Sequence, residues 1–127
     1  MAGLLHNLAE GLRALYEDLT AYSDRLLVVV MSEFGRRVQE NDGLGTDHGH
    51  GSAMLLLLGG PVRGGRVYGQ WPGLAPEQLV GPGDLAVTTD YRDVLAEIIA
   101  RRLNNPNLAA IFPDYAPTFR GVVASGT

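Results

Sequence analysis

Residues that could bind a metal ion lie between two apolar segments of the chain, 26–31 and 53–58. The stretch between these segments is polar and rich in glycine. Its candidate ligands, all carboxylates or imidazoles, are Glu33, Asp47, His48 and His50. Imidazole and carboxylate together suit zinc, manganese or iron better than the all-oxygen sites that calcium and magnesium prefer. These residue types indicate a divalent-metal site, and the alternative interpretation is a solvated loop that binds nothing.

Two arginines lie shortly after the first apolar segment, beyond Ser32–Gly35. A guanidinium can hold an anionic group through paired hydrogen bonds, so Arg36 and Arg37 are candidates for binding a substrate anion. The alternative is an ion pair with a nearby carboxylate. Ser32 could act as a nucleophile only beside a base, and the G-x-S-x-G motif is absent from the chain.

The surrounding pattern predicts the elements that would position these groups. The two apolar segments are short and bounded by turn signals, which predicts strands buried on both faces, with any chemistry just beyond their carboxyl ends. Apolar residues at spacings of three and four predict helices over 2–23 and 91–103. Candidate N-caps of the second helix are Thr88, Thr89 and Asp90. A helix leading by a short turn into a buried strand is half of a parallel α/β unit.

Length and composition set limits on the class of protein. The chain has 127 residues, a net charge of −4 and no cysteine. We therefore expect one α/β domain over residues 1–115, with no disulfide and no electrostatic reason for a nucleic-acid or membrane partner. Residues 116–127 lack periodicity, which predicts a mobile tail. No signal peptide opens the chain and no apolar run is long enough to span a membrane, so the compartment stays open.

Four sequence blocks resemble a known bacterial family. They are VVVMSEFGRR (28–37), the glycine-rich block 45–74, TTDYRDVLAEIIARRL (88–103) and LAAIFPDY (108–115). Together they resemble the C-terminal part of domain of unknown function 1501, a family assigned to the alkaline phosphatase and sulfatase superfamily. The resemblance implies part of a doubly wound sheet with helices packed on it. It also implies descent from a metal-dependent hydrolase of phosphate or sulfate esters, and relatives of this family are often exported.

The same resemblance assigns roles to individual residues. Glu33 stands where the superfamily has a metal-ligating Asp, and Phe34 stands where the next ligand, a His, is expected. His48 or His50 is similar to a further metal-binding His, and Asp47 would ligate the metal or orient a histidine. Arg36 would stabilise the oxyanion.

The superfamily's nucleophile lies in an N-terminal half that has no counterpart in these residues. The resemblance therefore implies an incomplete site, inactive alone, whose uncovered apolar surfaces lead to a homo-oligomer or to docking with the missing half. The alternative function is a non-catalytic α/β module that works by assembling with a partner.

Overall fold

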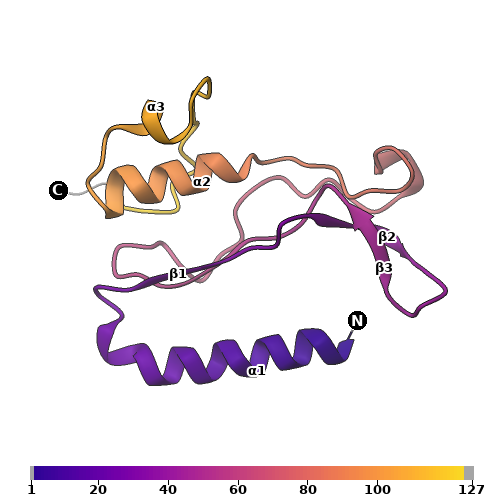
Figure 1. Ribbon diagram of the computed structural model, residues 1–127, viewed down its shortest axis with the longest axis horizontal. Coiled ribbons are helices and arrows are strands. Elements are labelled where there is room, and N and C mark those ends of the chain that lie inside the picture. Colours follow the sequence, from indigo (N-terminus) through magenta and orange to yellow (C-terminus); the bar gives the residue numbers. More distant parts are fainter. Residues whose placement is uncertain (1, 125–127) are drawn as a thin grey trace. The chain divides into compact units, whose positions relative to one another are not determined.

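The computed structural model describes residues 2–124, which form helices and short antiparallel sheets (Figure 1). They divide into two compact units: residues up to Gly60 with Trp71–Val87, and Pro61–Gln70 with the residues from Thr88 onward. The elements of the first unit, in chain order, are α1 (Ala2–Leu19), η1 (Thr20–Tyr22), β1 (Leu27–Val30), β2 (Gly35–Glu40), β3 (Thr46–Gly49), β4 (Leu55–Leu58) and η2 (Pro76–Gln78). Those of the second are α2 (Tyr91–Glu97), the π-helical turn η3 (Ile98–Arg102) and α3 (Leu108–Ile111). The predicted α/β class is confirmed.

The two predicted apolar strands pair with each other, but in the antiparallel sense. β1 and β4 align so that Leu27 faces Leu58 and Val30 faces Leu55. A parallel pair needs a crossover, usually helical, whereas the segment between β1 and β4 contains only the β2–β3 hairpin. The predicted doubly wound arrangement is therefore not seen within residues 2–124, whose strands form two-stranded antiparallel sheets. Every residue of β1 is partly exposed and Leu55 is exposed, so neither strand is buried on both faces.

The glycine-rich stretch that the sequence presented as a loop folds into a hairpin. Strands β2 and β3 pair antiparallel, with Gly35 opposite Gly49 and Arg36 opposite His48. Asn41 closes the turn, because its side-chain oxygen accepts hydrogen bonds of 3.1 Å from the backbone N–H groups of Gly43 and Gly45. A strand is identified in a sequence by alternating apolar and polar positions. The residues of β2 and β3 are mostly polar and lack this alternation, so the sequence did not predict these strands.

Backbone hydrogen bonds attach two further segments to β2. The Arg36 N–H donates to the Gly51 carbonyl (3.2 Å), and the Gly51 N–H donates to the Leu85 carbonyl (3.1 Å). The Val38 N–H donates to the Gly83 carbonyl at 3.0 Å. The three segments approach so closely that a Cβ on Gly35 would overlap the Gly51 carbonyl, and one on Gly51 would overlap the Leu85 carbonyl. Glycine at both positions is what allows these segments to meet.

We expect Gly35→Ala to lower the free energy of unfolding by about 2–3 kcal/mol, because the added methyl group forces the backbone segments apart. Gly11→Ala is the matched control. No atom lies within 4 Å of a Cβ built at Gly11, which is in α1, so this change should raise helix stability by about 0.5–1 kcal/mol. Urea unfolding monitored by circular dichroism measures both. Equal stability of the two variants would show that the close approach at Gly35 is unimportant.

Two buried carboxylates organise the second unit. Its apolar core consists of Ala96, Ile98, Val122 and Val123. Beside this core, Glu97 on α2 is fully buried and accepts the backbone N–H groups of Arg120 (2.7 Å), Gly121 (2.8 Å) and Val123 (3.0 Å). The Arg101 guanidinium donates to the same carboxylate at 2.9 Å. Backbone donors from the C-terminal segment are thereby satisfied by a side chain of α2.

Asp93 has a parallel role one turn earlier on α2. Its carboxylate accepts hydrogen bonds from the Thr118 N–H and the Tyr115 hydroxyl, both 2.7 Å, and from the Arg120 guanidinium. Burial raises the pKa of Asp93, but these donors outweigh it and hold the pKa below its ordinary value. Burial and the bond to Asp93 raise the pKa of Tyr115 to about 12.

The C-terminal segment and the start of α2 bear on two further predictions. The predicted N-cap is confirmed, because the Asp90 carboxylate accepts the Arg92 N–H at 2.8 Å. Within the segment predicted as a mobile tail, backbone N–H groups over Thr118–Val123 donate to Asp93 and Glu97 of α2, acceptors that the pattern of the tail itself does not reveal. Residues 125–127 of that predicted tail lie outside the described residues.

Helix α1 begins where predicted but ends at Leu19, before the predicted end at residue 23, and it buries no residue. Four of its leucines stay exposed, with exposed fractions of 73% for Leu4, 57% for Leu5, 46% for Leu8 and 39% for Leu15. The predicted packing of helices on a sheet is thus not seen for α1. No helix within residues 2–124 has the length and apolar character needed to cross a bilayer.

Candidate functional site

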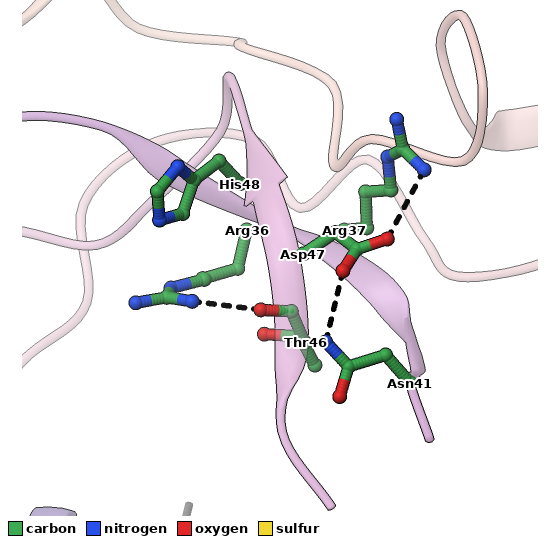
Figure 2. Close-up of a pocket in the computed structure, with 6 residues that line it drawn as sticks. All are labelled: Arg36, Arg37, Asn41, Thr46, Asp47 and His48. Atoms are coloured by element: carbon green, nitrogen blue, oxygen red, sulfur yellow. Dashed lines mark hydrogen bonds and ion pairs between the residues drawn. The ribbon is translucent and has the colours of Figure 1, made fainter. Parts of the chain in front are cut away.

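Most of the predicted site residues lie on the β2–β3 hairpin, and they are distributed over its two faces. Side chains alternate between the faces of a strand, so neighbours point in opposite directions. Figure 2 shows Arg36 and His48 on one side of the hairpin, and Arg37 and Asp47 on the other. These groups line a shallow, open pocket together with Asn41 and Thr46. The hairpin therefore carries two distinct sets of polar groups.

The first set contains Arg36, His48 and the neighbouring Phe34. The Arg36 guanidinium donates to the Thr46 carbonyl at 2.7 Å and lies 5.5 Å from the centre of the Phe34 ring. The Phe34 and His48 rings are 3.9 Å apart between centroids. Phe34, at a position where the resemblance led us to expect a metal ligand, thus packs on the imidazole of a predicted ligand. Within residues 2–124, no carboxylate forms an ion pair with Arg36.

The second set centres on Asp84, whose side chain is 5% exposed. His50 Nδ1 lies 2.7 Å from Asp84 Oδ2, while the imidazole itself is 81% exposed. Arg37 links Asp84 to Asp47, with separations of 3.7 Å and 3.3 Å. Asn41 donates to Asp47 at 2.8 Å. An ionised carboxylate only accepts hydrogen bonds, so His50 carries its proton on Nδ1 and keeps Nε2 as a free acceptor when neutral.

Asp84 was not among the residues that the sequence singled out. Asp84 is positioned by a tight turn over Val80–Asp84, in which the Asp84 N–H donates to the Val80 carbonyl at 2.8 Å. Gly81 and Gly83 in this turn have positive φ. The residue then pairs with Arg37 across a β-bridge. The available signal was the position of Asp84, which follows a Gly-Pro-Gly turn and precedes the extended segment 85–87. The partner of His50 is far away in sequence, which is why spacing around the histidines did not reveal it.

The four predicted metal ligands do not converge. Glu33 lies in the exposed bend before β2, and Asp47 and His48 lie on opposite faces of the hairpin. Among residues 2–124, no group of three or more His, Cys, Asp or Glu side chains is arranged to hold a metal ion. Zinc or manganese needs several donors around one point. In this arrangement, the predicted ligands therefore do not fit a metal centre formed by the described residues alone.

Ser32 has partners that do not activate it. Its hydroxyl donates to the Phe34 carbonyl at 2.7 Å and lies 3.2 Å from the Ser52 hydroxyl. Neither partner is a base, so the contacts of Ser32 provide no route to a nucleophilic alkoxide.

Comparison with known proteins identifies the family of the chain. A family model described as "Protein of unknown function (DUF1501)" matches residues 1–105. No curated protein and no solved structure matches the chain. The family resemblance found in the sequence is thereby confirmed, and this family has no established function.

Proposed function

Because the chain belongs to the DUF1501 family, whose function is unknown, we propose from its geometry that it supplies part of a site that hydrolyses phosphate or sulfate monoesters. The observation that carries this function is the 2.7 Å contact between His50 and the buried Asp84. The site works in an assembly of copies, and a single chain is inactive. The substrate class follows from the resemblance of the sequence to the alkaline phosphatase and sulfatase superfamily.

The His50–Asp84 pair is suited to moving a proton. Asp84 holds Nδ1–H, so Nε2 of His50 takes a proton from a water molecule as its oxygen attacks the phosphorus or sulfur. Nε2 then gives that proton to the ester oxygen as its bond to phosphorus or sulfur breaks. The products are an alcohol and inorganic phosphate or sulfate. Asp84 stabilises the imidazolium between these two transfers, and its burial strengthens that interaction.

The guanidinium beside this pair belongs to Arg37, which contacts Asp84 at 3.7 Å. Arg36, to which the sequence assigned oxyanion stabilisation, lies on the other face of the hairpin. Since Glu33, Asp47, His48 and His50 lie apart, the proposed proton transfer uses no metal. The prediction that hydrolysis requires zinc or manganese is tested by adding or removing these metals in the assay.

The surface of the chain supports the requirement for assembly. Exposed apolar side chains include a stripe of leucines on α1, Leu55 on β4 and Met31 beside β1. Apolar surface of this extent marks an interaction site. A stripe along one helix packs against the same stripe of a second copy in a two-fold dimer, the commonest arrangement of identical chains.

The same exposed leucines also favour the alternative function, a non-catalytic module that only assembles. The alternative makes no use of the His50–Asp84 pair. A test of ester hydrolysis, and not a test of oligomer formation, therefore distinguishes the two functions.

We expect hydrolysis of p-nitrophenyl phosphate or p-nitrophenyl sulfate whose rate per chain rises with chain concentration. The rise should coincide with dimer formation measured by sedimentation velocity, because an isolated chain lacks a complete site. Parallel reactions with added zinc, added manganese and chelator test the predicted metal. Dimer formation without hydrolysis in any of these reactions would favour the non-catalytic module.

A further inference from the structure

Arg36 borders a second pocket, which shares Arg37 with the proposed hydrolytic site but contains neither His50 nor Asp84. The side chains that line this pocket are those of Arg36, Arg37, Val38, Ser52, Ala53, Trp71, Leu74 and Leu85. Arg36 and Arg37 supply positive charge, Ser52 supplies a hydroxyl, and the other five are apolar or aromatic. All of them belong to the first compact unit. The pocket is therefore formed within one unit and combines positive charge with an apolar wall.

The Arg36 cation of this pocket is held in place and still available. One nitrogen of the Arg36 guanidinium donates to the Thr46 carbonyl at 2.7 Å, which fixes the side chain against β3. A guanidinium has five N–H donors, so this bond leaves most of them free. No carboxylate within residues 2–124 forms an ion pair with Arg36, in contrast to Arg37, which contacts both Asp47 and Asp84. An exposed cation without an anionic partner beside apolar surface favours a ligand that supplies the anion.

The apolar wall is positioned by backbone contacts and not by burial. Leu85 is placed by the hydrogen bond that its carbonyl accepts from the Gly51 N–H, and Val38 by the bond from its N–H to Gly83. The loop carrying Trp71 and Leu74 turns at Gly73, where φ is +89° and a Cβ would overlap the Gln78 side chain. Trp71 is 68% exposed and Leu74 is 51% exposed. These side chains present apolar surface to the pocket and to solvent, which a ligand would cover.

We propose that this pocket binds a small organic anion, a carboxylate with a compact apolar body. Its carboxylate accepts hydrogen bonds from the Arg36 guanidinium, and its apolar body lies against Trp71, Leu74 and Leu85. The proposed contacts use neither His50 nor Asp84, although their chain neighbours Gly51 and Leu85 line the pocket.

The probe is 4-tert-butylbenzoate, and Trp71 reports its binding because it is the only tryptophan in the chain. We expect a saturable change in tryptophan fluorescence with 4-tert-butylbenzoate. The neutral 4-tert-butylbenzamide and the cationic 4-tert-butylbenzylamine have the same apolar body, and we expect each to bind at least about fivefold more weakly. Saturation-transfer NMR follows each probe directly, so that a silent tryptophan does not conceal binding.

Variants assign the binding to Arg36. We expect Arg36→Gln to weaken binding of the benzoate about fivefold, with Arg36→Lys between Arg36→Gln and the wild type. Arg66→Gln removes an exposed arginine outside this unit and should leave the affinity unchanged. Circular dichroism confirms that each variant is folded. Equal binding of the anion, the amide and the amine, or no saturable binding by either measurement, would overturn the proposal.

Discussion

Replacing Glu97 with alanine should lower the free energy of unfolding of the second unit by about 4 kcal/mol. The side chain is fully buried, and its two oxygens accept four hydrogen bonds. Three come from the backbone N–H groups of Arg120, Gly121 and Val123, and the fourth comes from Arg101. Removing the carboxylate leaves these donors without an acceptor and Arg101 without its counter-charge, and buried unpaired donors are expensive.

Hydrogen exchange measures this effect at the bonds themselves. In the wild type, the amides of Arg120, Gly121 and Val123 should exchange slowly, because their hydrogens are bound to Glu97. In Glu97→Ala, their protection should fall to that of exposed amides. Glu97→Gln keeps the shape of the side chain but has one acceptor oxygen instead of two, so an intermediate loss is expected. Leu103→Ala, which alters a side chain that is 65% exposed in the same unit, is the control for a nonspecific loss of stability.

Protection of these three amides that is unchanged in Glu97→Ala would show that the C-terminal segment is held by other contacts. Slow exchange that depends on Glu97 would explain why this segment is ordered although its sequence has no periodicity.

Elements whose signals are local in sequence were predicted well. The apolar runs at β1 and β4, the leucine stripe of α1 and the Asp90 cap of α2 each depend on neighbouring residues, and each is present in the structure. The direction of pairing was not predictable from those runs, because the composition of a strand does not specify its partner. β1 and β4 pair antiparallel with the β2–β3 hairpin between them, and this hairpin was not predicted because its residues are mostly polar or glycine.

Long-range polar pairs were the other feature that the sequence did not reveal. Asp84 lies 34 residues after His50, and Glu97 receives hydrogen bonds from residues 23 to 26 positions later. Charged residues on a helix are usually solvated, so nothing near Asp93 or Glu97 indicated burial. The candidate metal ligands are the converse case, because they are close in sequence but do not converge among the described residues. Glu33, Asp47, His48 and His50 are close in sequence, yet a strand sends adjacent side chains to opposite faces.

The function that we propose depends on His50, and His50→Ala should reduce ester hydrolysis by about 100-fold or more, the usual contribution of a general acid–base group. Asp84 orients the imidazole through the 2.7 Å contact, so Asp84→Asn should also reduce the rate, because an amide can present its N–H to Nδ1 and favour the wrong tautomer. His6→Ala is the matched control, since His6 is exposed on α1 and has no part in the proposed site.

Adding imidazole to the buffer distinguishes a loss of the catalytic side chain from a loss of folding. A small base can replace the missing side chain of His50→Ala and restore part of the rate, but it cannot repair a misfolded protein. Restoration should be absent in Asp84→Asn, whose own imidazole still occupies the site.

The most direct measurement is therefore the rate of p-nitrophenyl ester hydrolysis by His50→Ala relative to His6→Ala, at a chain concentration where both variants are dimers. We predict a rate about 100-fold lower for His50→Ala, partly restored by imidazole. Equal rates in the two variants, or no hydrolysis by the assembled wild-type chain, would contradict a hydrolytic role for the His50–Asp84 pair.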